Sequence, residues 1–304
     1  MRYITEDEVA RNLPMSDVIK DLKEALTYLN KGKARYYPRQ RLEADGGILN
    51  TMPAAVDPWH IAGLKTYYAS KSGARFVVTV FDTTNQKPLC VIEANKLGQL
   101  RTGALPALVS KMLLKESDPV FTLIGSGYQA ETQLEGILNQ FRPAEIRVYS
   151  KNNEHAKSFA TKMQDRHAIK IKVAKSNLEA LSNATLISSI TDSVEPVIQG
   201  DFLEERYHLN LCGANLLNRR EADSKSISQS EIVIVESLNQ ARLESAEISE
   251  FEKAGDRSRL IEMKDIFDGS DYTGKYRKSV FKTMGIGLED LAAAHALMRN
   301  LGIS

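Results

Sequence analysis

The chain has 304 residues, 42% of them hydrophobic, and a formal net charge of +1. This length is enough for two domains with substantial cores. The near-neutral charge, without a long run of either sign, argues against nucleic acid or a charged membrane surface as the main partner. The sequence has no apolar stretch long enough to span a membrane and no evident signal peptide, so a cytoplasmic location is expected.

The first third of the chain is predicted to contain two helices followed by short strands. Thr5 and Glu8 form a capping-box pattern for the first helix, and Ser16 is expected to cap the second. Turn residues separate the strands that follow, and consecutive strands with short turns indicate an antiparallel sheet. The strands are expected at 37–42, 47–52, 61–68, 76–82 and 89–93, with a helix at 99–115.

From Val120 onward strands alternate with helices, which is the pattern of a parallel, doubly wound sheet. A last amphipathic helix is expected at 289–299. The fold class predicted is therefore α/β, with an N-terminal α+β antiparallel-sheet domain at 1–114 and a Rossmann domain at 115–284. The segment 285–304 is expected to return to the first domain. The parallel strands are expected at 121–124, 146–149, 170–173, 186–189, 208–211 and 232–235.

The most informative motif follows the first of these parallel strands, where Gly125, Gly127 and Ala130 form the pattern G-x-G-x-x-A. In a dinucleotide-binding fold the first glycine allows a tight turn and the second lets the backbone approach a pyrophosphate. The third small residue lets the helix pack closely against the strand. The helix N-terminus offers N–H groups to the phosphates. Tyr128 and Gln129 lie in the same turn and are further cofactor-binding candidates.

The end of the next strand indicates which dinucleotide is bound. An NAD enzyme usually has Asp or Glu there to bind the ribose hydroxyls. This chain has Ser150, Lys151 and Asn152 instead, so no carboxylate repels a 2′-phosphate and Lys151 could attract one. NADP(H) is therefore favoured over NAD(H), with a solvated loop charge as the competing interpretation of Lys151. Thr191, after the fourth parallel strand, is a further candidate contact or an ordinary loop cap.

Basic residues in the first domain are candidate substrate ligands. Arg39 and Arg41 are expected to share one face of a strand, because side chains alternate along it. Lys65 lies in a largely apolar strand, where an ammonium group needs a partner or a pocket. Together with Arg101, these cations suit a carboxylate substrate, since arginine binds carboxylates in a bidentate manner and a desolvated lysine can transfer a proton. An ordinary surface charge is the alternative interpretation of each.

Metal sites and disulfides are not expected. Cys90 and Cys212 lie in apolar runs and are predicted to be free thiols in a reducing compartment. Neither cysteine has a second cysteine or a histidine at metal-ligand spacing, and the five histidines are scattered.

Several motifs occur in an order that resembles the ornithine cyclodeaminase/mu-crystallin family over nearly the whole chain. This resemblance implies a substrate-binding and dimerisation domain followed by a Rossmann domain. It also implies a homodimer and NAD(P)-dependent chemistry on small amino, imino or keto acids. The motifs are Met52-Pro53-Ala54, Gly63-Leu64-Lys65, Leu100-Arg101-Thr102-Gly103-Ala104, the glycine turn, Gly213-Ala214-Asn215 with Arg219-Arg220-Glu221, and Gly285-Ile286-Gly287-Leu288-Glu289-Asp290.

The resemblance also implies roles for individual residues. Either Arg39 or Arg41 corresponds to the strand arginine of the family and, with Arg101, would hold the substrate carboxylate. Lys65 would touch the carboxylate or the reacting nitrogen and relay the proton. Thr102 would contact a phosphate of the cofactor.

One position departs from the cyclodeaminase pattern. Cyclodeaminases have an aspartate after the Gly-Ala motif, whereas this chain has Asn215, which cannot act as a general base near neutral pH. Asn215 could still bind the cofactor or substrate, or serve as a helix cap or turn former. The sequence thus favours an NAD(P)-dependent oxidoreductase that interconverts a small α-imino or α-keto acid and the α-amino acid, such as a ketimine reductase or an alanine dehydrogenase. An ornithine cyclodeaminase and a non-enzymatic NADP-dependent binding protein are the alternatives.

Overall fold

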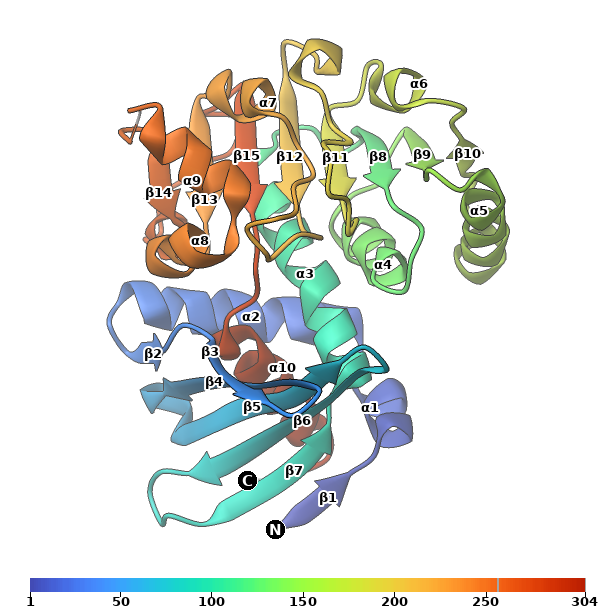
Figure 1. The fold of residues 1–304 in the computed structure, drawn as a ribbon. Helices are drawn as coiled ribbons and strands as arrows, with labels where there is room; N and C mark the ends of the chain where they lie inside the picture. The colour runs from blue at the N-terminus through green and yellow to red at the C-terminus, as the bar shows by residue number, and fades with distance from the viewer. Residues whose placement is uncertain (256, 304) are drawn as a thin grey trace. The chain divides into compact units, whose positions relative to one another are not determined.

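The computed structural model describes residues 1–255 and 257–303, which form two compact units (Figure 1). The boundary between the units lies after Leu105, inside helix α3 (Asn95–Leu113), whereas the sequence suggests a boundary after residue 114. Residue 256, within the predicted Rossmann domain, and residue 304, the end of the predicted returning segment, lie outside the described residues. Unit 1 comprises 1–105, 267–269 and 285–303; unit 2 comprises 106–255, 257–266 and 270–284.

Unit 1 is built on a seven-stranded sheet with the order β1-β7-β6-β5-β4-β2, in which β3 also pairs with β4. The antiparallel pairing predicted from the sequence is present, but β1 runs parallel to β7, so the sheet is mixed. The sequence misses β1 and β2 because each has only three residues. The strands are β1 (Arg2–Ile4), β2 (Ala34–Tyr36), β3 (Gln40–Ala44), β4 (Gly47–Val56), β5 (Ile61–Ser70), β6 (Gly73–Asp82) and β7 (Pro88–Glu93).

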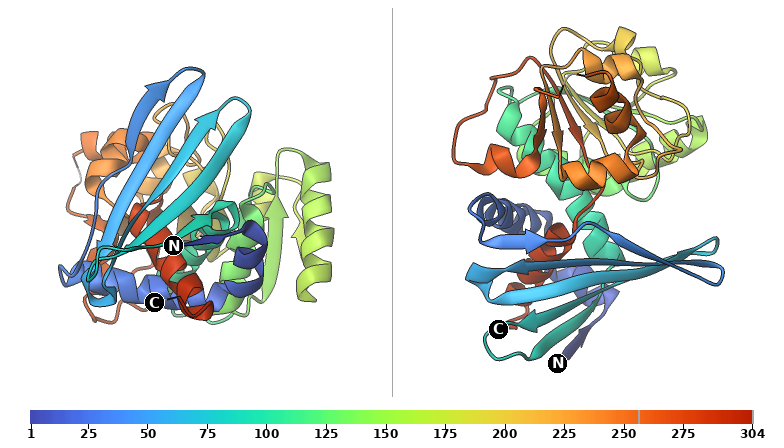
Figure 2. Two further views of the ribbon diagram at one scale, coloured as in Figure 1. Left: turned by 90° about the horizontal axis from the view of Figure 1, so that it is seen from below. Right: turned by 60° about the vertical axis from the view of Figure 1, so that its left-hand side comes forward.

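One face of this sheet is covered by helix α10 (Gly287–Asn300), which packs against β4, β5, β6 and helix α2 (Met15–Asn30) (Figure 2). Every second residue is buried in β4 from Asn50 to Val56 and in β5 from Ile61 to Lys65, as expected for a sheet with one covered face. The predicted capping box is present in α1 (Glu6–Asn12). The cap predicted at Ser16 is wrong, because α2 begins at Met15 and Pro14 occupies the cap position without a side-chain hydrogen bond.

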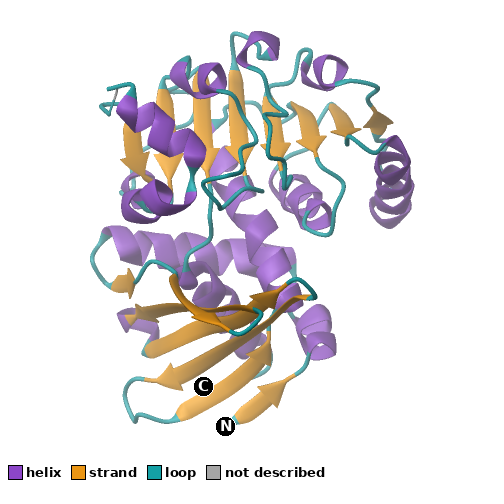
Figure 3. Cartoon of the chain, viewed as in Figure 1, coloured by secondary structure: helices purple, strands orange, loops and turns teal. Residues whose placement is uncertain are grey.

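Unit 2 is built on an eight-stranded, all-parallel sheet with the order β10-β9-β8-β11-β12-β15-β13-β14 (Figure 3). The chain starts at β8 and winds outward first to one side and then to the other, which confirms the predicted doubly wound sheet. The sequence misses two strands, since β14 is short and β15 begins and ends with lysine. The strands are β8 (Val120–Ile124), β9 (Glu145–Tyr149), β10 (Lys172–Val173), β11 (Leu186–Ser189), β12 (Tyr207–Leu211), β13 (Ile232–Val235), β14 (Leu260–Glu262) and β15 (Lys278–Lys282).

Helices cover both faces of the parallel sheet, so its central strands are buried almost completely, as in β12, where all five residues are buried. One part of the core joins β8 and β9 to the apolar sides of the two helices that follow these strands. The helices are α4 (Ala130–Gln140), α5 (Asn153–His167), α6 (Asn177–Leu181), α7 (Ser224–Ser228), α8 (Leu238–Glu244) and α9 (Ala246–Lys253), with short 3-10 helices at Asp57–Trp59, Gly200–Phe202 and Met263–Phe267.

The structure bears on three expected absences. Cys90 is buried and Cys212 is partly buried, and both are free thiols. Within residues 1–255 and 257–303, no group of three or more His, Cys, Asp and Glu side chains is placed to hold a metal ion. Of the helices in these ranges, none has the length and apolar character needed to cross a membrane. The cytoplasmic location stays a prediction from the sequence.

Candidate active site

Unit 1 contains a buried cluster of four charged side chains. Lys65 of β5 donates a hydrogen bond to Asp290 Oδ1 at 3.0 Å. Arg101 of α3 donates from Nε to the same oxygen at 3.1 Å and from Nη1 to Glu289 Oε2 at 2.7 Å. Both acids lie in the first turn of α10, where Glu289 Oε1 also accepts from the backbone N–H of Ile286 at 3.2 Å. The start of α10 therefore holds both cations.

Burial gives this cluster unusual electrostatics. Lys65 is 4% exposed and Arg101 is 8% exposed, while both acids are fully buried. Burial lowers the pKa of Lys65 from 10.5 to about 8, because the charged form is poorly solvated. The carboxylate of Asp290 opposes this pKa shift, and the charges of Arg101 and Arg39 add to it. Lys65 can thus exchange a proton near neutral pH.

One carboxylate oxygen of the cluster is available to accept a hydrogen bond. Asp290 Oδ2 is buried and accepts no hydrogen bond from the described residues. A buried carboxylate oxygen usually has a hydrogen-bond partner. The cluster can therefore accept one further N–H or O–H donor at this oxygen.

The two candidate strand arginines lie in different surroundings. Arg39 precedes β3, is half-buried, and donates from Nη2 to Gly285 O at 3.4 Å. Gly285 has φ +84°, and a Cβ there would lie 2.7 Å from Arg101 Nη1. The glycine thus lets the backbone pass close to both arginines. Arg41 is exposed on β3, whereas Arg39 lies before the first residue of that strand, so the two arginines are not both in a strand as the sequence predicts.

Thr102 lies one residue after Arg101 in α3. Its hydroxyl donates to Gly98 O of the same helix at 2.7 Å. Donation from this hydroxyl to a cofactor phosphate would require that bond to be replaced.

In unit 2 the glycine turn has the features of a pyrophosphate cradle. Gly125 has φ +111°, and a Cβ there would lie 2.5 Å from Ile190 O, so the turn requires glycine. A Cβ at Gly127 would meet no described atom within 4 Å. Helix α4 begins at Ala130, and its cap residue Gln129 makes no side-chain cap bond, which leaves backbone N–H groups at the helix start for an anion. Tyr128 is exposed beside them. These residues fit a dinucleotide.

The loop after β9 holds the three residues predicted to select the cofactor. Asn152 Oδ1 accepts from the backbone N–H groups of Glu154 and His155 at 3.0 and 3.2 Å, so this side chain caps α5. Lys151 is exposed and Ser150 is half-buried. The structure therefore assigns Asn152 a capping role and leaves Lys151 at the surface of the loop.

The last two cofactor candidates lie in loops at the carboxyl ends of β11 and β12. Thr191 donates from its backbone N–H and its hydroxyl to Glu221 Oε1 at 2.7 and 3.1 Å. Asn215 lies in an irregular loop, and the next helix begins only at Ser224, so Asn215 is not a helix cap. Neither residue belongs to a regular element.

Three acids of these sites, Glu221, Glu289 and Asp290, were not assigned a role from the sequence. The signal was present, because all three belong to motifs that carry the family resemblance. A local pattern could not give the roles of Glu289 and Asp290, because their cationic partners are far away in the sequence; Lys65 and Asp290 are 225 residues apart.

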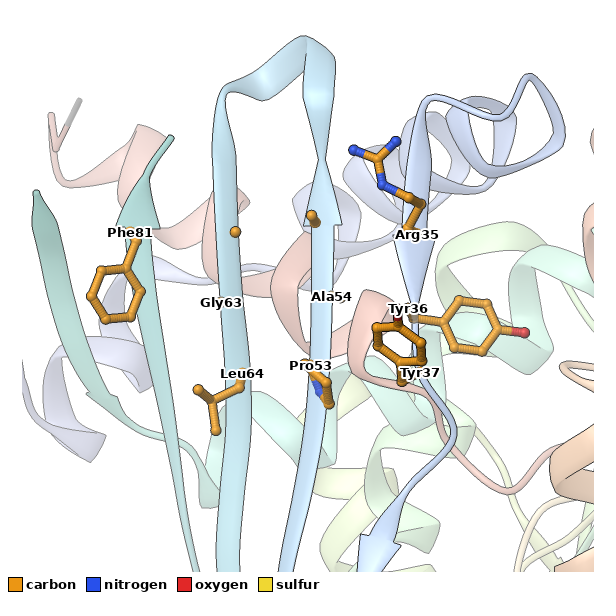
Figure 4. Close-up of a pocket in the computed structure, with 10 residues that line it drawn as sticks. Arg35, Tyr36, Tyr37, Pro53, Ala54, Gly63, Leu64 and Phe81 are labelled. Carbon is orange, nitrogen blue, oxygen red and sulfur yellow. The ribbon is translucent and has the colours of Figure 1, made fainter. Parts of the chain in front are cut away.

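A pocket of about 560 Å³ lies on the other face of the unit 1 sheet (Figure 4). Its floor includes Pro53, Ala62 and Leu64, whose side chains alternate with the buried ones of β4 and β5. Tyr37 and Phe81 also line it and are 68% and 39% exposed. Of the described residues that line the pocket, Arg35 is the one charged residue and the others are mostly apolar, and the pocket is distinct from the charged cluster.

Comparison with known proteins identifies relatives along the whole chain. The model of the ornithine cyclodeaminase/mu-crystallin family matches residues 2–302. Ketimine reductase mu-crystallin of Rattus norvegicus is 28% identical over 305 residues, covering 96% of this chain and 95% of that protein. The structure of Thermococcus litoralis Δ1-pyrroline-2-carboxylate reductase in complex with NADH and L-proline has a TM-score of 0.92 at 25% identity, covering 100% and 99%. An archaeal alanine dehydrogenase dimer with bound NAD has a TM-score of 0.90 at 25% identity, covering 99% and 95%.

We expect Gly127→Val to weaken dinucleotide binding by at least about tenfold, a loss of about 1.4 kcal/mol, while the thermal midpoint of the unliganded protein stays near wild type. The reason is that the new side chain enters open space, which the pyrophosphate would otherwise occupy. Titration of NADH and NADPH by nicotinamide fluorescence measures the affinity. Gly125→Ala is the contrasting variant, since its Cβ collides with Ile190 O and should lower the midpoint itself. Unchanged affinity of Gly127→Val for both dinucleotides would contradict the assignment.

Proposed function

The chain belongs to the ornithine cyclodeaminase/mu-crystallin family, and from this premise we propose that it is an NAD(P)-dependent oxidoreductase that interconverts a small α-imino or α-keto acid and the corresponding α-amino acid. The observation that carries the proposal is the buried Lys65–Arg101–Asp290 cluster. Relatives named ketimine reductase, alanine dehydrogenase and Δ1-pyrroline-2-carboxylate reductase support it. Unit 1 binds the substrate and unit 2 binds the cofactor.

Arg101 of the cluster and the neighbouring Arg39 bind the substrate carboxylate. A guanidinium and a carboxylate form charge-assisted, often bidentate hydrogen bonds that fix the substrate in both position and direction. The carboxylates of Asp290 and Glu289 already hold the Arg101 side chain, so its conformation needs to change little when the substrate binds. Arg39 rather than Arg41 is the second arginine, because Arg39 contacts Gly285 beside Arg101 and its charge acts on Lys65.

Lys65 transfers the proton. Reduction of an imine adds a hydride to carbon and a proton to nitrogen, and the bound nicotinamide supplies the hydride. With a pKa of about 8, Lys65 is mostly protonated at neutral pH and can give its proton to the substrate nitrogen. Asp290 holds the ammonium group in place and favours its charged form. In the oxidative direction the neutral amine of Lys65 takes the proton back.

The proposal is tested by two assays run side by side. The first contains pyruvate and ammonium, or a cyclic imino acid, with NADPH or NADH; the second contains ornithine with catalytic NAD(P). We expect oxidation of NADPH or NADH in the first assay. In the second assay we expect no release of ammonia, which a cyclodeaminase would produce. Lys65→Met should depress turnover more than Arg101→Lys, since it removes the proton donor altogether. Proline and ammonia from ornithine, without turnover in the first assay, would establish the deaminase instead. Absence of turnover in both would favour a binding protein.

The charge of Asp290 should set the pH dependence of the reaction. In the reductive direction kcat/KM should fall as pH rises above about 8, because Lys65 loses its proton there. Asp290→Asn removes the charge that raises the Lys65 pKa, so the fall should begin at lower pH. Asp21→Asn is the matched control, because Asp21 is equally buried in unit 1 but pairs with His295 and Arg299. An unchanged profile in Asp290→Asn would contradict the assignment.

NADP(H) is the preferred cofactor in this proposal, and Lys151 is the reason. Its ammonium group can pair with a 2′-phosphate, and Ser150 and Asn152 bring no repelling carboxylate. Lys151→Asp should therefore reverse the preference, weakening NADPH and not NADH in fluorescence titrations. Lys253→Asp makes the same charge change on the exposed end of α9 and should leave the ratio unaltered. Tighter binding of NADH than NADPH by the wild-type chain would refute the preference.

The apolar face of the unit 1 sheet supports a homodimer. Its pocket exposes Tyr37 and Phe81, and a second copy of this chain would cover them. The similar archaeal alanine dehydrogenase was solved as a dimer. Leu64→Glu places a charge on this face and should convert the dimer to a monomer in sedimentation at micromolar concentration. Leu178→Glu, at an exposed leucine of α6, should stay dimeric. A monomeric wild-type chain would rule the dimer out.

A further inference from the structure

Glu221 of unit 2 is a fully buried carboxylate surrounded by donors. It follows β12 and accepts five hydrogen bonds from protein groups, each from a residue of the β11 or β12 region. Oε1 accepts from Ser189 Oγ at 2.7 Å, Thr191 N at 2.7 Å and Thr191 Oγ1 at 3.1 Å; Oε2 accepts from Gly213 N at 2.6 Å and Ala214 N at 3.3 Å. One carboxylate thus fixes two loops at once.

The two loops are in direct contact where Glu221 binds them. A Cβ at Gly213 would lie 1.9 Å from Thr191 O and 2.3 Å from Thr191 N. Only glycine allows the backbones to approach this closely. The Glu221 carboxylate therefore lies beside a tight contact between the backbones of Gly213 and Thr191.

Two further buried groups support the carboxylate. The Nζ of Lys282 donates to Ala214 O at 2.7 Å and lies 4.0 Å from Glu221 Oε2 and 3.8 Å from Glu247 Oε1. The backbone N–H of Glu221 donates to Glu247 Oε1 at 2.9 Å. Lys282, Glu221 and Glu247 are all nearly or fully buried, so their charges need partners inside the protein. They find these partners in one another and in the loop N–H groups.

The place of these loops in the sheet indicates what they serve. β8 carries the glycine turn for the pyrophosphate, and the neighbouring β9 ends at the loop that selects the adenosine ribose. β11 and β12 lie on the opposite side of β8, across the point where the strand order reverses. A dinucleotide bound across the carboxyl ends of these strands has its nicotinamide half on the β11 and β12 side.

We propose that Glu221 is a positioning residue for the nicotinamide half of the dinucleotide, acting through the loops that contain Thr191 and Ala214. The proposal rests on the proposed function, since it presumes a bound NAD(P). Glu221 itself does not touch the cofactor. It holds the backbone of both loops in one arrangement before the cofactor binds, which removes an ordering cost from binding.

The test compares a whole dinucleotide with its adenosine half. Glu221→Gln places an amide N–H₂ against backbone donors, so one loop must move away. We expect the Kd for NADPH to rise at least about tenfold, which is about 1.4 kcal/mol, while the Kd for ADP-ribose changes less than about twofold. Both are measured by titration well below the thermal midpoint. Glu244→Gln, a buried glutamate of α8 that bonds Gln240, is the control and should leave both affinities unchanged.

Each outcome separates the inference from the proposed function. An unchanged NADPH affinity in Glu221→Gln, or an equal loss for ADP-ribose, would overturn the positioning role alone. A wild-type chain that binds neither NADPH nor NADH would overturn the proposed function and this inference with it. If Glu221→Gln does not fold, Ser189→Ala decides, because it removes one donor from Oε1 and Ser189 is buried within β11. A selective loss of about threefold for NADPH supports the role, and no selective loss overturns it.

Discussion

The arrangement of unit 1 depends on one requirement, that the buried carboxylate of Asp290 be paired. An ionised group inside a protein loses its hydration, and removing one partner of a buried pair costs about 3–5 kcal/mol. Asp290 meets this requirement with Lys65 and Arg101, which come from β5 and α3. The interaction therefore joins three elements that are distant in the sequence. Unit 2 repeats the principle with Glu221, whose charge is met mainly by backbone N–H groups.

Features set by local chemistry could be predicted from the sequence. The turn at Gly125 requires a positive φ and a nearby strand and helix, all within a few residues, and the structure contains them. Each of the six parallel strands that the sequence predicts has at least two aliphatic residues among four. The sequence does not predict β15, because lysines flank its apolar residues. Its place between β12 and β13 also depends on pairing with strands far away in the chain.

The charged cluster shows where sequence reasoning ends. Lys65 and Arg101 could be singled out, since a cation in an apolar strand or at a motif needs an explanation. The identity of their partners could not, because Lys65 pairs with Asp290, 225 residues away, and Arg101 pairs with Glu289, 188 residues away. Glu289 does cap α10 with one oxygen and binds Arg101 with the other. The choice between Arg39 and Arg41 likewise depends on where Gly285 lies, and alternation along a strand carries no information about that.

The network around Glu221 and the cluster of Lys65 and Asp290 differ in whether they contain a group that can exchange a proton with the substrate. The Glu221 carboxylate accepts five hydrogen bonds from protein groups, so neither of its oxygens is available to take a proton from a substrate. Lys65 is the opposite case, because burial and Asp290 act on its pKa in opposing directions and leave it near 8. Imine reduction consumes one hydride and one proton, so a single lysine with such a pKa is sufficient. Cyclodeamination needs a further base, and the position where the resemblance predicts one holds the amide of Asn215. The absence of a carboxylate at this position supports the proposed reduction over cyclodeamination.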